Sequence, residues 1–101
     1  MVDLTAIHNV MQELEKIFNK YSDIDKVVLF GSRARGDYKS TSDIDLCIFG
    51  NSLSKRDRYS ILDDIDEIET FYSFDVVFFD ELDEEQIKES VLGDMKKIYG
   101  R

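Results

Sequence analysis

The spacing of apolar and polar residues along the chain predicts three amphipathic helices and three short strands. Steps of three and four between apolar residues indicate a helix with one buried face, whereas short apolar or alternating runs indicate strands. The helices are predicted over residues 4–21, 59–68 and 87–99, and the strands over 26–30, 43–49 and 74–79. In the second strand Ile44, Leu46 and Ile48 share one face, and Asp43, Asp45 and Cys47 share the other.

The order of these elements, α-β-β-α-β-α, predicts an α+β fold in which helices cover a small mixed β-sheet in two layers. The chain has 101 residues, no proline and no visible linker or repeat. Residues 1–101 are therefore expected to form a single domain.

Charge and composition exclude several classes of protein. The 22 acidic and 13 basic residues give a net charge of −9, which excludes direct nucleic-acid binding through a basic face. Residues 59–95 hold most of the acids, either as solvated helix faces or as a docking surface for a basic protein partner. No apolar run approaches the ~18 residues of a membrane span, and the N-terminus lacks signal-peptide features. With Cys47 as its only cysteine, the protein is expected to be cytoplasmic.

The first candidate site is the Gly31-Ser32 step that ends the first predicted strand. A glycine there allows a phosphate to approach the backbone closely, and the serine hydroxyl adds a hydrogen-bond donor. Arg33 and Arg35 follow at once, and guanidinium groups suit phosphate oxygens. Taken alone, the same residues also fit an ordinary turn with surface arginines.

Aspartates in two apolar strands form the second candidate site. Asp43 and Asp45, two residues apart on a strand, point the same way and lie about 6.5 Å apart along it. Asp75 lies in the third predicted strand, so neighbouring strands would bring three carboxylates together. Like charges 5 Å apart at an effective dielectric constant of 20 repel by about 3 kcal/mol. The cluster therefore favours bound divalent cations or protonation, unless the acids face bulk water.

These two sites together resemble a known family. The stretch 29–36, Leu-Phe-Gly-Ser-Arg-Ala-Arg-Gly, is followed after a short loop by Ser-Asp-Ile-Asp-Leu at 42–46. This combination resembles the nucleotidyltransferase superfamily that includes DNA polymerase β, and most of all its minimal nucleotidyltransferases (MNT proteins). Asp75 falls where the family places its third catalytic acid. The resemblance covers roughly residues 26–79.

The resemblance implies a role for each site residue. Gly31 and Ser32 would hold the β- and γ-phosphates of ATP, with Arg33 and Arg35 as further nucleotide-binding residues. The catalytic acids Asp43, Asp45 and Asp75 would bind two Mg²⁺ ions, and Asp75 would ligate the ion beside the attacking hydroxyl and help to activate it. The hydroxyl would attack the α-phosphorus of ATP, and pyrophosphate would leave.

The resemblance also implies a partner. Larger members of the superfamily carry an added substrate-binding domain, and little sequence follows the last predicted helix, so we expect another chain to supply most of the acceptor site. Proteins similar to this one pair with a HEPN-family RNase toxin, act as its antitoxin and transfer AMP to a toxin tyrosine, which implies a hetero-oligomer. Two alternatives are adenylylation of a small-molecule hydroxyl and neutralisation of a partner by binding without catalysis.

Overall fold

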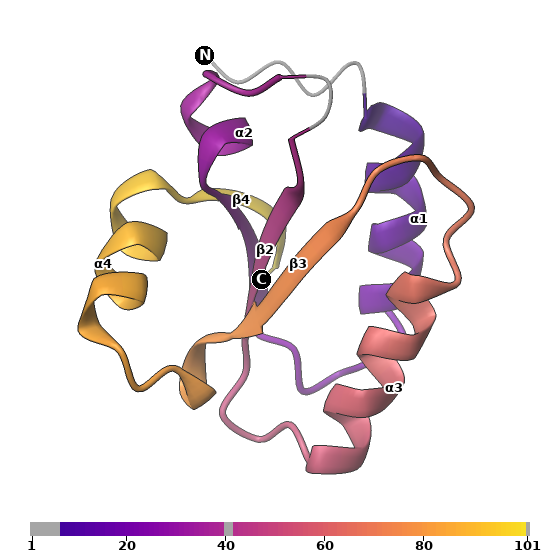
Figure 1. Ribbon diagram of the computed structural model, residues 1–101. Helices are drawn as coiled ribbons and strands as arrows, with labels where there is room; N and C mark the ends of the chain where they lie inside the picture. Colours follow the sequence, from indigo (N-terminus) through magenta and orange to yellow (C-terminus); the bar gives the residue numbers. More distant parts are fainter. Residues whose placement is uncertain (1–6, 40–41, 101) are drawn as a thin grey trace.

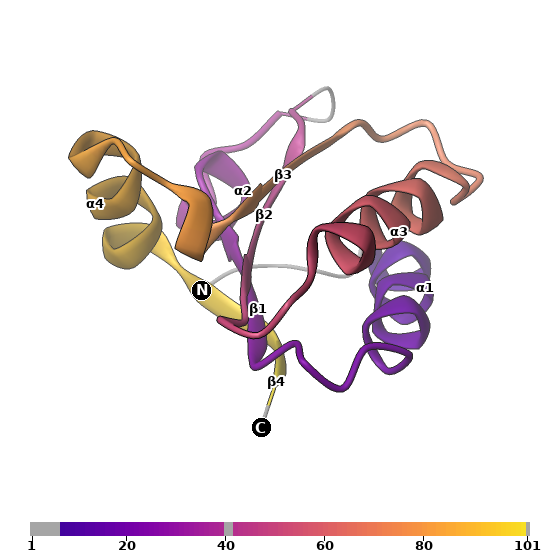
Figure 2. The same ribbon diagram turned by 90° about the horizontal axis from the view of Figure 1, so that it is seen from below.

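The structure is a computed structural model that describes residues 7–39 and 42–100. A four-stranded sheet forms its centre, with helices on both faces (Figures 1 and 2). In chain order the elements are α1 (His8–Phe18), β1 (Lys26–Phe30), α2 (Ser32–Arg35), β2 (Ile44–Phe49), α3 (Lys55–Asp66), β3 (Phe74–Phe78), the 3₁₀ turn η2 (Phe79–Glu81), α4 (Glu85–Asp94) and β4 (Lys96–Gly100).

The sheet is mixed, with the strand order β3-β2-β1-β4. Strand β1 runs antiparallel to both β2 and β4, whereas β2 and β3 are parallel. The central strands β1 and β2 are the most buried, because each is flanked by a strand on both sides and covered by side chains on both faces. The α+β class predicted from the sequence is confirmed.

Each face of the sheet packs against a different set of helices. On one face α1 and α3 cover Val27, Leu29, Ile44, Leu46 and Ile48, which belong to the larger core. On the other face α4 covers a smaller core of Val28, Phe30, Cys47 and Val91. The two-layer prediction is therefore incomplete, because α4 adds a layer on the second face.

The long helices begin and face inward for reasons visible in the sequence. The apolar stripe of α1 buries Val10, Leu14, Ile17 and Phe18, as predicted, while Leu4 lies outside the described residues. Helix α3 begins after Ser54, whose hydroxyl accepts a hydrogen bond from the amide of Asp57 at 3.0 Å. Among the described residues, no helix is long and apolar enough to cross a membrane.

The prediction of a last helix over residues 87–99 is wrong in its second half. Helix α4 ends at Asp94, and residues 96–100 form the edge strand β4 beside β1. A β-bulge in this pairing lets the consecutive residues Ile98 and Tyr99 both pack against the larger core. Spacings of three and four from Val91 to Met95, Ile98 and Tyr99 mimic a helix because the bulge breaks strand alternation.

Candidate functional site

The candidate residues gather on the α4 face of the sheet, where β1 ends and β2 and β3 begin. Phe30, the last residue of β1, pairs with Asp45 of β2, and Asp45 pairs in turn with Asp75 of β3. Directly after β1 the chain turns into the short helix α2, which lies above this end of the sheet in Figure 1. Three strands and one helix thus supply the site.

Gly31 makes the turn from β1 into α2, and its conformation explains why glycine occupies the position. Its φ of 73° and ψ of −154° lie in a region that residues with a Cβ rarely adopt. A Cβ on Gly31 would also collide with Oδ2 of Asp45. The carbonyl of Gly31 accepts hydrogen bonds from the amides of Ala34 and Arg35, both at 3.1 Å. The amides of Ser32 and Arg33, at the start of α2, therefore lie where a helix offers donors to an anion.

Asp45 and Asp75 are paired residues of the parallel neighbours β2 and β3, whereas Asp43, which was predicted to begin the second strand, lies one residue before β2. Asp45 is half-buried, whereas Asp43 and Asp75 are exposed. Burial raises the pKa of the Asp45 carboxyl, the charges of Asp75 and Asp43 raise it further, and Arg35 and Arg33 oppose the rise. Both neighbouring acids are therefore close enough to repel the Asp45 carboxylate.

Oxygen ligands of this kind fit Mg²⁺, which prefers carboxylates and keeps several waters. Within residues 7–39 and 42–100, no three His, Cys, Asp or Glu side chains lie close enough together to form a preassembled metal site. Asp43 and Asp75 are exposed, so neither carboxylate is enclosed by the core. The donor set thus fits the ion in chemistry and in strand placement.

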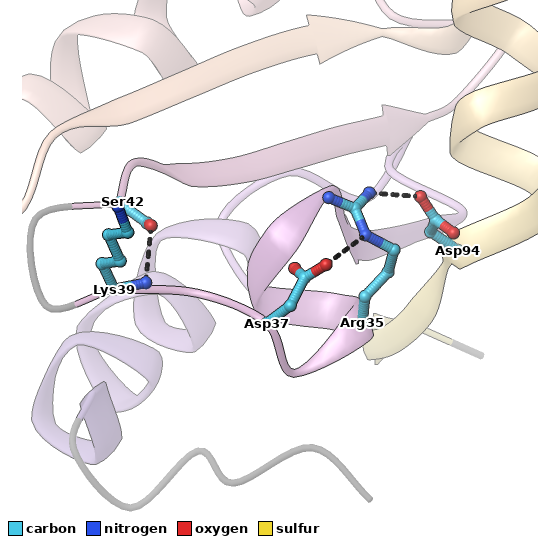
Figure 3. Close-up of polar contacts among 5 residues, drawn as sticks. All are labelled: Arg35, Asp37, Lys39, Ser42 and Asp94. Carbon is cyan, nitrogen blue, oxygen red and sulfur yellow. Dashed lines mark hydrogen bonds and ion pairs between the residues drawn. The ribbon is translucent and has the colours of Figure 1, made fainter.

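Arg35 is held beside the turn by two carboxylates, as Figure 3 shows. Its Nη1 lies 2.9 Å from Oδ2 of Asp94 at the end of α4, and its Nε lies 3.2 Å from Oδ2 of Asp37. These hydrogen bonds raise the pKa of the Arg35 guanidinium, which is exposed and positively charged. Asp94 therefore links α4 to the helix that follows the Gly31 turn.

Arg33 has a different environment from the one that its predicted nucleotide contact requires. Its side chain is buried, and Nε and Nη2 donate to the carbonyl of Ser42 at 3.2 and 3.1 Å. The guanidinium carbon lies 4.7 Å from the ring centroid of Tyr38 and 4.9 Å from that of Tyr72. This geometry gives no support to the prediction that Arg33 binds the nucleotide.

Four residues around the site were not assigned to it by the sequence analysis. Ser42, Tyr38 and Tyr72 surround Arg33, and Asp94 pairs with Arg35. Ser42 stands next to Asp43 and lies within the motif, so its position was a usable signal. Tyr72 and Asp94 come from distant segments, and nothing local in the sequence marks them.

Comparison with known proteins identifies a matching family, a sequence relative and similar structures. A family model described as "Polymerase beta, Nucleotidyltransferase" matches residues 12–101. The curated protein MJ1305 of Methanocaldococcus jannaschii, named as a proposed protein adenylyltransferase, is 38% identical over 68 residues. That match covers 63% of this chain and 46% of MJ1305, so the aligned part is about half of the relative's length.

Solved structures share the fold. A toxin–antitoxin crystal structure with AMP-PNP matches with a TM-score of 0.67 and 18% identity, over 90% of this chain and 73% of that chain. A complex of tri-AMPylated Shewanella oneidensis HEPN toxin with MNT antitoxin matches with a TM-score of 0.57 and 18% identity, again over 90% and 73% of the two chains.

Proposed function

Because this chain belongs to the polymerase beta nucleotidyltransferase family, we propose that it transfers AMP from ATP to a hydroxyl group of a partner protein. The observation that carries the proposal is the contact of the Gly31 turn with Asp45, whose strand partner is Asp75. This contact supports a site in which the turn would bind the phosphates and the carboxylates beside it would bind the ions. AMP transfer needs both, because the triphosphate and its charge-neutralising ions must lie together.

In the proposed reaction the start of α2 binds the triphosphate. The amides behind Gly31 and the hydroxyl of Ser32 would donate to the β- and γ-phosphates. Arg35 would reach the triphosphate from its exposed position beside Asp37 and Asp94. Arginine suits this role because its planar donors match phosphate oxygens.

The carboxylates of Asp43, Asp45 and Asp75 would hold two Mg²⁺ ions, and Asp75 would hold the ion beside the acceptor hydroxyl. Bound there, Mg²⁺ would neutralise negative charge on the phosphates and on the attacking oxygen. The acceptor hydroxyl forms a bond to the α-phosphorus and loses its proton with the help of Asp75, while the bond to pyrophosphate breaks. Asp75 is exposed on the edge strand β3, where an acceptor can approach from outside the sheet.

We propose a HEPN-family toxin as the partner and a tyrosine hydroxyl as the acceptor. The support is the fold shared with toxin–antitoxin structures, one of which contains an AMPylated toxin, together with the adenylyltransferase name of MJ1305. In this reading the protein is an antitoxin, and modification of the toxin is what neutralises it. The acceptor site is then completed by the partner chain.

The test is incubation of the protein with ATP, Mg²⁺ and the protein encoded beside it, followed by intact-mass and peptide mass spectrometry. We expect the partner to gain one or more AMP groups on tyrosine, and Asp43→Asn to abolish the gain. Neutralisation of the partner without any mass change would support an antitoxin that acts by contact alone. Pyrophosphate release that depends on an added small hydroxyl compound would support a small-molecule adenylyltransferase.

A further inference from the structure

Arg33 is the only buried charged side chain among the described residues, with 3% of its surface exposed. Burial of a guanidinium is costly unless its donors and its charge find partners. None of the ion pairs within residues 7–39 and 42–100 includes Arg33. Its partners are one backbone carbonyl and the faces of two tyrosine rings.

The carbonyl that Arg33 holds belongs to Ser42, the residue directly before Asp43. Two donors of one rigid, planar group reach the same oxygen, so the carbonyl is fixed in direction as well as in distance. Ser42 is held on its other side by Lys39, because its amide donates to the Lys39 carbonyl at 2.9 Å. Its hydroxyl also accepts from the Lys39 amide at 2.9 Å (Figure 3). The backbone that enters Asp43 is therefore anchored at three points.

Helix α2 touches the aspartate strand at two places. At its start, Gly31 lies against the carboxylate of Asp45. Arg33, the second residue of the helix, donates two hydrogen bonds to the carbonyl of Ser42. The two contacts bracket Asp43, and they join the proposed phosphate-binding turn to the proposed metal ligands.

We propose that Arg33 is a positioning residue that fixes Asp43, and hence its metal-binding position, relative to the triphosphate-binding turn. This inference rests on the proposed function, because it concerns how the same site binds metal. Tyr38 and Tyr72 keep the guanidinium in place by stacking on it, as aromatic faces do for arginine. Arg33 thus acts on the reaction through Asp43 and does not itself contact ATP.

The test measures Mn²⁺ binding to the full chain by electron paramagnetic resonance of the free ion. Arg33→Met keeps the length of the side chain but loses both donors, and we expect its Mn²⁺ affinity to fall about 10- to 100-fold, the usual effect of losing a group that orients a metal ligand. Arg33→Lys retains the charge and a single donor nitrogen in place of two, and it should recover part of the affinity. The same order is expected for the Mg²⁺ concentration that half-saturates AMP transfer.

Arg58 provides a matched control elsewhere in the fold. Its Nη1 donates to the carbonyl of Leu53 at 2.8 Å, and its Nε lies 3.2 Å from Glu81, so it also holds a backbone carbonyl. We expect Arg58→Met to lower the melting temperature but to leave Mn²⁺ affinity at the wild-type value. If circular dichroism shows that Arg33→Met is unfolded, the Mn²⁺ affinities of Arg33→Lys and Arg58→Met are compared instead. A lower affinity in Arg33→Lys than in Arg58→Met supports the positioning role.

The possible results distinguish the positioning role of Arg33 from the proposed AMP transfer. Wild-type Mn²⁺ affinity in a folded Arg33 variant, or an equal loss in Arg58→Met, would overturn the positioning role while AMP transfer by the wild-type chain still stood. Absence of Mn²⁺ binding and of AMP transfer in the wild type would instead overturn the proposed function, and the positioning role with it.

Discussion

At the scale of single residues, the site depends on a position that only glycine fits. We expect Gly31→Ala to weaken ATP binding at least tenfold, because the added methyl group would collide with Asp45 and the backbone would be strained. Strain of this kind costs about 1–3 kcal/mol, so the melting temperature should fall as well. Calorimetric titration with a non-hydrolysable ATP analogue and a thermal melt measure the two effects. Wild-type affinity in the variant would show that the turn does not bind the triphosphate.

Asp45, unlike Gly31, is a residue at which function and stability oppose each other. Since burial and the neighbouring acids raise the pKa of its carboxyl in the folded state, the folded protein binds this proton more tightly than the unfolded chain does. The stability that this group contributes is complete below its unfolded pKa of about 3.9. It is lost as the pH rises through the raised folded value.

We therefore expect Asp45→Asn to be more stable than the wild type at pH 7 and to lose that advantage as the pH falls toward about 4. Its AMP transfer should fall at least about 100-fold, because a lost metal ligand removes several kcal/mol of transition-state stabilisation. Thermal melts from pH 4 to pH 8 in the presence of EDTA measure the stability difference. A variant that is less stable than the wild type at pH 7 would contradict the assigned environment of Asp45.

At the scale of elements, Gly93 is a glycine in the last turn of α4 with open space around it. A Cβ at this position would meet no atom within 4 Å, and the backbone has no positive φ. We expect Gly93→Ala to raise stability by about 0.5 kcal/mol, because alanine loses less backbone entropy on folding. The same substitution at Gly31 and at Gly93 should thus shift the melting temperature in opposite directions, and differential scanning calorimetry of both variants tests this contrast.

Local sequence pattern was sufficient for the elements whose side chains alternate or repeat regularly. It predicted α1, α3 and the first three strands to within about four residues at each end and put Asp45 and Cys47 on one face, although α3 begins at Lys55 and Asp43 precedes β2. It failed at β4, where the bulge beside Val27 and Val28 makes consecutive residues face one core. It also gave no sign that Arg33 is buried, since the two tyrosine rings and the Ser42 carbonyl around it come together only through tertiary packing.

At the scale of the whole molecule, the two faces of the sheet differ in the side chains that they carry. The face covered by α1 and α3 holds the larger apolar core, and the other face carries the aspartates beside a smaller core under α4. Strand β4 belongs to neither the turn nor the carboxylate set, but it covers the outer edge of β1.

Removal of residues 96–101 should therefore affect association as well as stability. Without β4, the apolar strand β1 becomes an unprotected edge that can pair with another chain. The contact between the Tyr99 and Phe18 rings, with centroids 5.5 Å apart, is also lost. We expect a loss of at least about 2 kcal/mol, or roughly 8 °C in melting temperature, together with concentration-dependent self-association in light scattering. The double variant Lys96→Thr/Lys97→Thr keeps the backbone pairing and should stay monodisperse, whereas self-association of both variants would point to lost charge as the cause.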